Sequence, residues 1–264
     1  MTAKRLGVAV DDLGVDPKEG LHQAARLGYG TVELRTCENE VDPANLSQTG
    51  VRHLRKFTET LGLEIAVLSG PTGRGGVGDP AVTEYHVDKT RRILELAAKL
   101  SVPVVTVRLD AIPEEPDDRR RRLITEALDH LGEHADKTGT FLAVLAAEHS
   151  PLTLRRLLDD LNCPMLRVGY DPGALLIRGY DPIAGVGELA GHIAASHLRD
   201  ATRGTPATAG REVRMGTGQV PFLEYLAALE EGQYTGPHIV RRTDAADPLA
   251  EFAAARQYLE RLLR

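Results

Sequence analysis

The feature that most constrains this chain of 264 residues is a regular alternation between short apolar runs and amphipathic segments. Eight runs of four to six residues have the length and composition of buried strands. They lie at 6–10, 31–35, 64–68, 103–107, 141–145, 166–170, 193–198 and 238–241. Between them, apolar residues recur at helical spacing, as at Ile93, Leu96, Ala97 and Leu100. Strand and helix therefore alternate along the whole chain.

Turn residues punctuate this alternation. Asp-Pro pairs are expected to start helices, because Asp accepts hydrogen bonds from free amides and Pro loses none in the first turn. These pairs lie at 16–17, 42–43, 79–80, 181–182 and 247–248. Eight strand-helix units joined by right-handed crossovers close into a barrel, which needs about 250 residues. We expect an α/β protein, a (β/α)8 TIM barrel with one domain over 1–264. A doubly wound open sheet is the alternative.

Composition narrows the class of protein. Hydrophobic residues make up 42% and charged residues 27%, which is typical of a globular chain, and the formal charge of −6 disfavours binding to nucleic acid. No run approaches the ~20 apolar residues of a membrane helix, and Met1–Arg5 carries no signal-peptide core, so we expect a cytoplasmic protein. Cys37 and Cys163 lie far apart, which predicts neither a disulfide nor a zinc site.

Charged residues follow several of the expected strands. Because strand ends converge at one mouth of a barrel, these residues predict a site for a small polar molecule there. The Gly-rich stretch 73–78 matches the dinucleotide spacing, but it begins several residues after its strand and no suitable acid follows. Loop 70–78 is therefore either a mobile lid or a passive loop.

Four short motifs occur in order along the second half of the chain. They are Gly-Tyr-Asp-Pro-Gly at 169–173, Ser-His-Leu-Arg-Asp at 196–200, Met-Gly-Thr-Gly-Gln-Val at 215–220 and Tyr-Thr-Gly-Pro at 234–237. With them the chain resembles the xylose isomerase-like barrel family of sugar phosphate isomerases and epimerases over essentially its whole length. The resemblance implies a manganese or magnesium ion held by Glu, Asp, His and Glu at the ends of strands 5 to 8.

Only two of these four ligands have a match in the chain. Asp171 matches the strand 6 ligand and His197 the strand 7 ligand, and Asp200 matches a second acid in the strand 7 motif. The strand 5 position falls on Leu145 and the strand 8 position on Arg241. Neither side chain binds a hard cation, and the Arg241 charge repels one, so we expect no tightly held metal and no cofactor.

The sequence allows several arrangements of the charged side chains at the mouth of the barrel. A shifted register would bring Glu148, three residues beyond Leu145, into the site. Arg241 would form a bidentate ion pair with Asp171 in the space of the metal. Alternatively, Arg108, which stands where the family tends to have His, joins Arg241 to make the mouth positive, and Arg grips carboxylates and phosphates well.

Three hypotheses for the function follow. In the first, the chain binds a small anionic, sugar-like molecule without a tightly held metal, through the contacts Arg108, Arg241, Arg199, Glu33 and Asp200. In the second, it is an active isomerase or epimerase using manganese or magnesium, in which Asp171, His197 and Glu148 form a rebuilt catalytic site for proton abstraction beside a carbonyl. In the third, it is a non-catalytic interaction protein. A homodimer is what the resemblance suggests.

Overall fold

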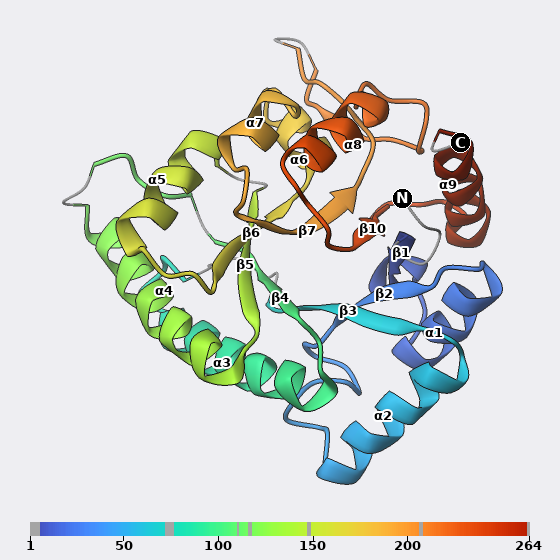
Figure 1. Cartoon of the computed structure of the whole chain (residues 1–264), viewed down its shortest axis with the longest axis horizontal. Helices are drawn as coiled ribbons and strands as arrows, with labels where there is room; N and C mark the ends of the chain where they lie inside the picture. Colours follow the sequence, from blue (N-terminus) through green and yellow to red (C-terminus); the bar gives the residue numbers. More distant parts are fainter. Residues whose placement is uncertain are drawn as a thin grey trace.

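Eight parallel strands close into a barrel with helices around it (Figure 1). The computed structural model describes residues 6–71, 77–109, 111–115, 118–146, 149–205 and 208–262. The barrel strands are β1 Leu6–Ala9, β2 Thr31–Arg35, β3 Glu64–Ser69, β4 Val104–Val107, β5 Phe141–Ala146, β6 Leu166–Tyr170, β7 Ile193–Leu198 and β10 His238–Val240. They pair in the order β1-β10-β7-β6-β5-β4-β3-β2, which returns to β1. The expected barrel is confirmed.

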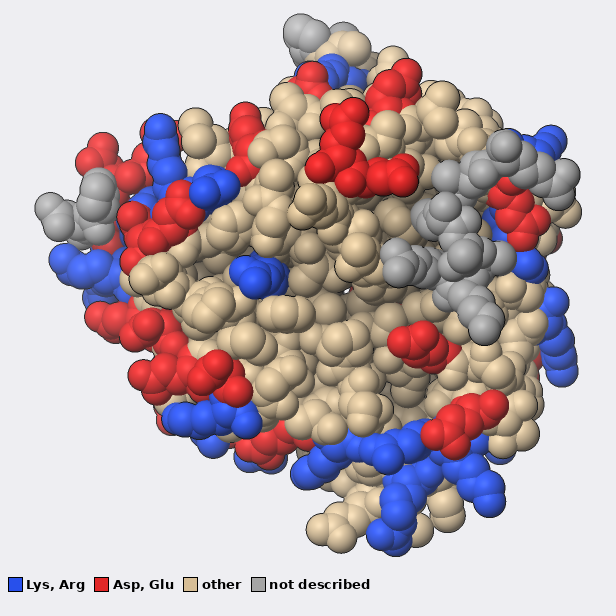
Figure 2. Space-filling model, in the orientation of Figure 1, with Lys and Arg blue, Asp and Glu red and all other residues tan. Residues whose placement is uncertain are grey.

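Helices follow the strands and pack on the outside of the barrel (Figure 1). They are α1 Pro17–Arg26, α2 Gln48–Thr60, α3 Thr83–Leu100, α4 Arg119–Thr138, α5 Pro151–Leu161, α6 Pro172–Ile177, α7 Ala184–Glu188, α8 Phe222–Glu231 and α9 Pro248–Leu262. A 3-10 turn, η2 Val10–Leu13, follows β1, and the short antiparallel strands β8 Ala201–Thr202 and β9 Arg211–Glu212 follow β7. In the view of Figure 2, basic side chains gather at the edge near α2, and the centre is largely uncharged.

The Asp-Pro signal for helix starts holds at some positions and fails at others. Asp16 caps α1 by accepting a hydrogen bond from the Glu19 amide at 3.0 Å, and α9 begins at Pro248. The expected start at 42–43 is wrong, because α2 begins five residues later, after its N-cap Ser47. Asp42 instead forms a buried ion pair with Lys89 of α3. The Asp42 carboxylate therefore serves a contact between two units of the barrel and not the start of α2.

Two apolar cores result from the alternation of side chains along the strands. The larger core lies between strands and helices and contains the predicted face of α3, which is buried. The smaller core fills the barrel and is built mainly from small or branched side chains: Ala9, Ala66, Val67, Val104, Ala143, Ala195 and Ile239. Two residues further along β1, β7 and β10, the next inward positions carry charge, which moves the polar chemistry to the carboxyl ends of the strands.

Candidate functional site

The carboxyl ends of the strands bring together a buried group of charged side chains. Ala195 and Ile239 of the inner core are followed two residues later by His197 and Arg241, and Glu33 lies near the end of β2. Ion pairs join this group into what we call the mouth network: Asp11, Asp12, Glu33, Asp171, His197, Arg199, Glu212 and Arg241. The network crosses the barrel from β2 to β7.

Arg241 is the cation of one half of the mouth network. Its Nε and Nη2 donate to the two carboxylate oxygens of Asp12 at 3.1 and 2.9 Å, which is the planar fork geometry of a bidentate pair. Its Nη1 donates to Glu33 at 2.9 Å and its Nη2 to Asp11 at 3.3 Å. The side chain is only 12% exposed. One guanidinium therefore neutralises carboxylates from the ends of two strands.

This pairing corrects the predicted one. The sequence suggested that Arg241 would reach Asp171, but the guanidinium that pairs with Asp171 is that of Arg199, with Nε at 2.9 Å from Oδ2. Arg199 also donates to Glu212 at 2.7 Å and to Thr243 at 3.0 Å. The Asp171 carboxylate caps α6 as well, by accepting a hydrogen bond from the Ala174 amide at 2.9 Å. A structural role for Asp171 in capping a helix was not expected from the sequence.

His197 joins the two halves of the mouth network. Its Nε2 lies 2.8 Å from Glu33 and its Nδ1 lies 3.7 Å from Asp171 Oδ2. Burial alone would lower the pKa of His197, but the charge of Glu33 and the hydrogen bonds to Asp171 and Glu33 outweigh it and raise that pKa. Both ring nitrogens face carboxylates, which favours the imidazolium form with a proton on each.

The pKa values of the carboxyl groups in the network shift in different directions, depending on whether the nearby cations outweigh burial. Burial alone would raise the pKa of Glu33, but His197, Arg241 and a hydrogen bond from Ser69 lower it to about 2. The pKa of Asp171 is lowered too, because Arg199 and His197 outweigh its burial. At Asp11, burial and the charges of Asp12 and Glu33 outweigh Arg241 and raise the pKa. Asp11 is thus the carboxyl of the network best suited to hold a proton.

Asp200 holds a loop together, although it was a predicted ligand contact. Its two oxygens accept hydrogen bonds from the amides of Ala201, Gly216 and Gly218 at 2.9 Å and of Val220 at 3.3 Å. The side chain is buried, with 3% of the residue exposed. A carboxylate occupied by four amides organises the segment before α8 and is not available to a ligand in this conformation.

The other predicted site residues have different surroundings. Leu145 is half-buried and packs over Gly169, where an added Cβ would lie 2.8 Å from Leu145 Cδ2. Arg108 is exposed after β4. Glu148, and residues 72–76 of the predicted lid, lie outside the described residues, so their roles remain predictions.

A pocket of about 470 Å³ adjoins the network beside β1 and β2. Asp11 and Arg35 both line it, together with residues of the following loops such as Val15, Cys37 and Asn39. Asp11 Oδ1 and Arg35 Nε are buried and have no hydrogen-bond partner among the described residues. Unsatisfied buried polar atoms are costly, which makes this pair a place for a polar ligand. Asp11 directly follows the first expected strand at 6–10, but sequence reasoning did not select it as a site residue.

The described residues do not fit the metal that the resemblance implies. Among them, no group of three or more His, Cys, Asp or Glu side chains is arranged to hold an ion. Asp171 is occupied by Arg199, and His197 faces a carboxylate through each nitrogen, whereas a metal needs a neutral imidazole with a free lone pair. Arg241 adds a fixed positive charge to the same mouth.

The sequence was compared with family profiles, curated proteins and solved structures. A profile of the family described as xylose isomerase-like TIM barrel matches residues 21–262. No curated protein sequence matches.

None of the helices in the described part of the chain has the length and apolar character needed to cross a membrane.

Several solved structures have the same fold. A xylose isomerase domain protein from Planctomyces limnophilus is 23% identical, with a TM-score of 0.87 over 98% of this chain and 96% of that one. A xylose isomerase-like TIM barrel protein from Mycobacterium smegmatis, in complex with magnesium, is 18% identical, with a TM-score of 0.81 over 100% and 98%. The 3-keto-D-glucoside 4-epimerase of E. coli is 17% identical, with a TM-score of 0.75 over 98% of both chains. With the profile match covering most of its length, this chain belongs to the xylose isomerase-like TIM barrel family.

Proposed function

We propose that this protein binds a small anionic, sugar-like molecule at the carboxyl mouth of its barrel without a tightly held divalent metal. The observation that carries the proposal is the position of Arg241, whose guanidinium pairs with Asp11, Asp12 and Glu33. A covalently attached cation supplies positive charge at this mouth, and one structural neighbour was solved in complex with magnesium. Names of structural neighbours, such as the E. coli epimerase, support a sugar-like ligand.

Charge decides where an anion would sit. The mouth network has five carboxylates against two guanidinium groups and one imidazolium, so it repels an anion placed directly over it. Arg35 lies beside the network, and its side chain is 36% exposed. Among the described residues its ion-pair partner is Glu38, at 3.4 Å, whose side chain is 76% exposed. The pocket that Arg35 shares with Asp11 therefore suits the acidic group of the ligand, and hydroxyl groups would face Asp11.

The pKa values bear on catalysis. A useful general base has a pKa near the working pH, whereas the pKa of Asp171 is lowered, and the raised pKa of His197 favours its imidazolium form. This pair is poorly suited to abstract a proton at neutral pH. Asp11, with its raised pKa, is the better candidate for proton transfer in any metal-free reaction.

The experiment that tests the proposal combines metal analysis with ligand binding. Purified protein should contain no stoichiometric manganese or magnesium, and neither ion should raise its melting temperature. Sugar acids and sugar phosphates should raise it and matched neutral sugars should not, and Arg35→Met should abolish the effect. Arg52→Met, an exposed arginine on α2, is the matched control. Tightly bound manganese would instead favour the metal-dependent isomerase or epimerase, and binding of neither class would favour an interaction protein.

A further inference from the structure

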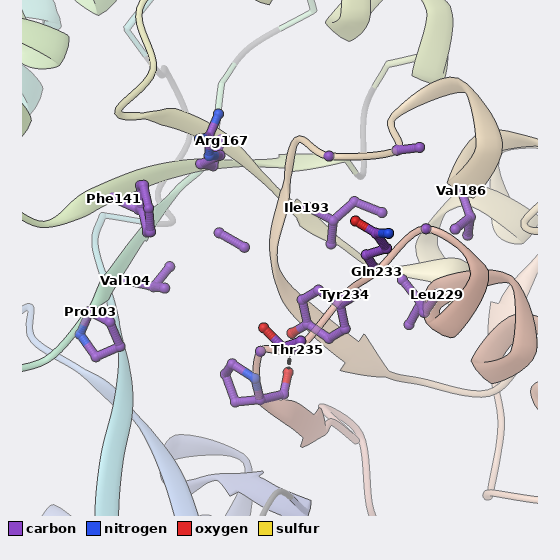
Figure 3. A pocket seen from close by; sticks show the side chains of 16 residues that line it. Pro103, Val104, Phe141, Arg167, Val186, Ile193, Leu229, Gln233, Tyr234 and Thr235 are labelled. Atoms are coloured by element: carbon purple, nitrogen blue, oxygen red, sulfur yellow. Dashed lines mark hydrogen bonds between the residues drawn. The ribbon is translucent and has the colours of Figure 1, made fainter. Parts of the chain in front are cut away.

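A second pocket lies at the amino ends of the strands, opposite to the mouth (Figure 3). Its walls include Val104, Phe141 and Ile193, the first residues of β4, β5 and β7. The segment between α8 and β10, with Gln233 and Thr235, forms another side. The pocket has a volume of about 290 Å³. That is near the lower end of the ~300–1,000 Å³ typical of small-molecule sites, so its size suits a small compound.

Some apolar side chains at this end of the barrel remain partly exposed. Phe141, Ile193 and Ala194 are only half-buried although they lie on barrel strands. One step further in, Ala143 and Ala195 are fully buried, with 0% exposed. Apolar surface that remains in contact with water at the floor of a pocket favours a ligand with an apolar body.

Arg167, on β6, is the one charged residue among those that line this pocket. Its guanidinium carbon lies 5.1 Å from the centre of the Phe141 ring, a cation–π contact. Within the described part of the chain no carboxylate pairs with it, in contrast to Arg199 and Arg241, which each pair with at least two. An unpaired guanidinium beside an apolar wall attracts an anion, and its planar fork matches a carboxylate.

A neighbouring histidine also feels the charge of Arg167. His192, next to the lining residue Ile193, has its pKa lowered first by burial and then by the charges of Arg155 and Arg167. Its Nδ1 is buried without a hydrogen-bond partner among the described residues.

From these contacts we infer a second ligand site, in which Arg167 binds the carboxylate of a small molecule whose apolar body packs on Phe141 and Ile193. The ligand class is a monocarboxylate with an aromatic or branched aliphatic body. A phosphate at neutral pH carries up to two negative charges, whereas the described lining offers one cation, which matches the single charge of a carboxylate. The inference does not depend on the function proposed for the mouth.

The test uses phenylacetate and 4-methylpentanoate as probes, with the neutral phenylacetamide as the shape-matched comparison, in calorimetry and ligand-observed NMR. Both carboxylates should bind the wild-type chain, at least tenfold more tightly than the amide. Arg167→Met keeps an unbranched stem but removes the charge, and it should weaken carboxylate binding at least tenfold. Arg156→Met removes the same charge from an exposed position on α5 and should change nothing.

A second variant separates binding from folding. Thr235 is exposed at the rim, so Thr235→Trp should fill the pocket and abolish binding while the melting temperature stays near that of the wild type. Arg35→Met, at the opposite end, should leave phenylacetate binding unchanged, which distinguishes this site from the mouth. The inference is overturned if no carboxylate binds at 10 mM, estimated as about the weakest affinity worth detecting. It is equally overturned if the amide binds as well, or if Arg167→Met retains full affinity.

Discussion

Replacing Arg241 by Met gives the most direct test of the mouth network. Met keeps much of the volume but leaves Asp12 and Glu33, whose side chains are 3% and 0% exposed, without their shared guanidinium. Removing one partner of a buried ion pair costs roughly 3–5 kcal/mol, because a buried charge remains uncompensated. We expect Arg241→Met to lower the free energy of unfolding by that amount at pH 7.

The pKa of Glu33 indicates how strongly the folded chain stabilises this carboxylate and how that stabilisation changes with pH. Its ordinary value of 4.5 falls to about 2 in the folded chain, which corresponds to a net stabilisation of the carboxylate by about 3 kcal/mol, after the cost of burial is set against the effects of His197, Arg241 and hydrogen bonds. A lowered carboxyl pKa adds stability above pH 4.5 that is lost as the pH falls through about 2. In Arg241→Met the pKa of Glu33 rises. As the pH falls, Glu33 of the variant is therefore protonated at a higher pH than in the wild type, and this removes its uncompensated buried charge. The gap between wild type and variant should therefore narrow from pH 7 to pH 4.

Urea unfolding followed by far-ultraviolet circular dichroism measures this, because the chain has no Trp to report by fluorescence. Arg156→Met is the control and should change stability by less than about 0.5 kcal/mol. Combining Arg241→Met with Glu33→Gln should cost less than the sum of the single changes, since the two groups interact directly. A loss below about 1 kcal/mol that does not vary with pH would refute the argument that Arg241 neutralises buried carboxylates.

Three further outcomes are expected. Arg241→Glu should gain stabilisation by Mn²⁺ that the wild type lacks, about 2.7 kcal/mol at a concentration 100 times the Kd, measured as a shift in melting temperature. Asp200→Asn should lower the free energy of unfolding by about 2–3 kcal/mol, because an amide cannot accept from four backbone donors; faster hydrogen exchange at Gly216 and Gly218 should accompany the loss. Gly169→Ala should cost about 1–3 kcal/mol through its contact with Leu145, and a second substitution, Leu145→Ala, should recover part of it in the same urea assay.

The fold could be predicted because its determinants are local. Each barrel strand is a short apolar run, and the alternation of inward and outward side chains along it is a property of extended backbone. That alternation also predicts which side chains reach the mouth: Glu33, His197 and Arg241 lie there as their positions require. Asp42 shows the limit of local signals, since its ion pair with Lys89 comes from another unit of the barrel.

Pairing within the mouth could not be predicted, because it depends on loops. Asp12 lies in a 3-10 turn after β1, and Glu212 lies on a hairpin strand 12 residues beyond Asp200, a separation along the chain that says nothing of distance. Glu212 forms a second ion pair with Arg199, and this pair holds the guanidinium against Asp171. Without this hairpin in view, Arg241 was the obvious partner for Asp171.

Under the proposed function, an arginine stands where the resemblance implies a metal, and this would change what the mouth can do. A divalent cation accepts lone pairs from a hydroxyl or carbonyl and so polarises it, whereas a guanidinium only donates hydrogen bonds and stays charged at every accessible pH. Arg241 is also permanent, so the carboxylates around it are held in place whether or not a metal is present. The cation of this mouth is suited to organise buried acids and to orient a ligand, and any proton transfer falls to a carboxyl such as Asp11, whose pKa is raised.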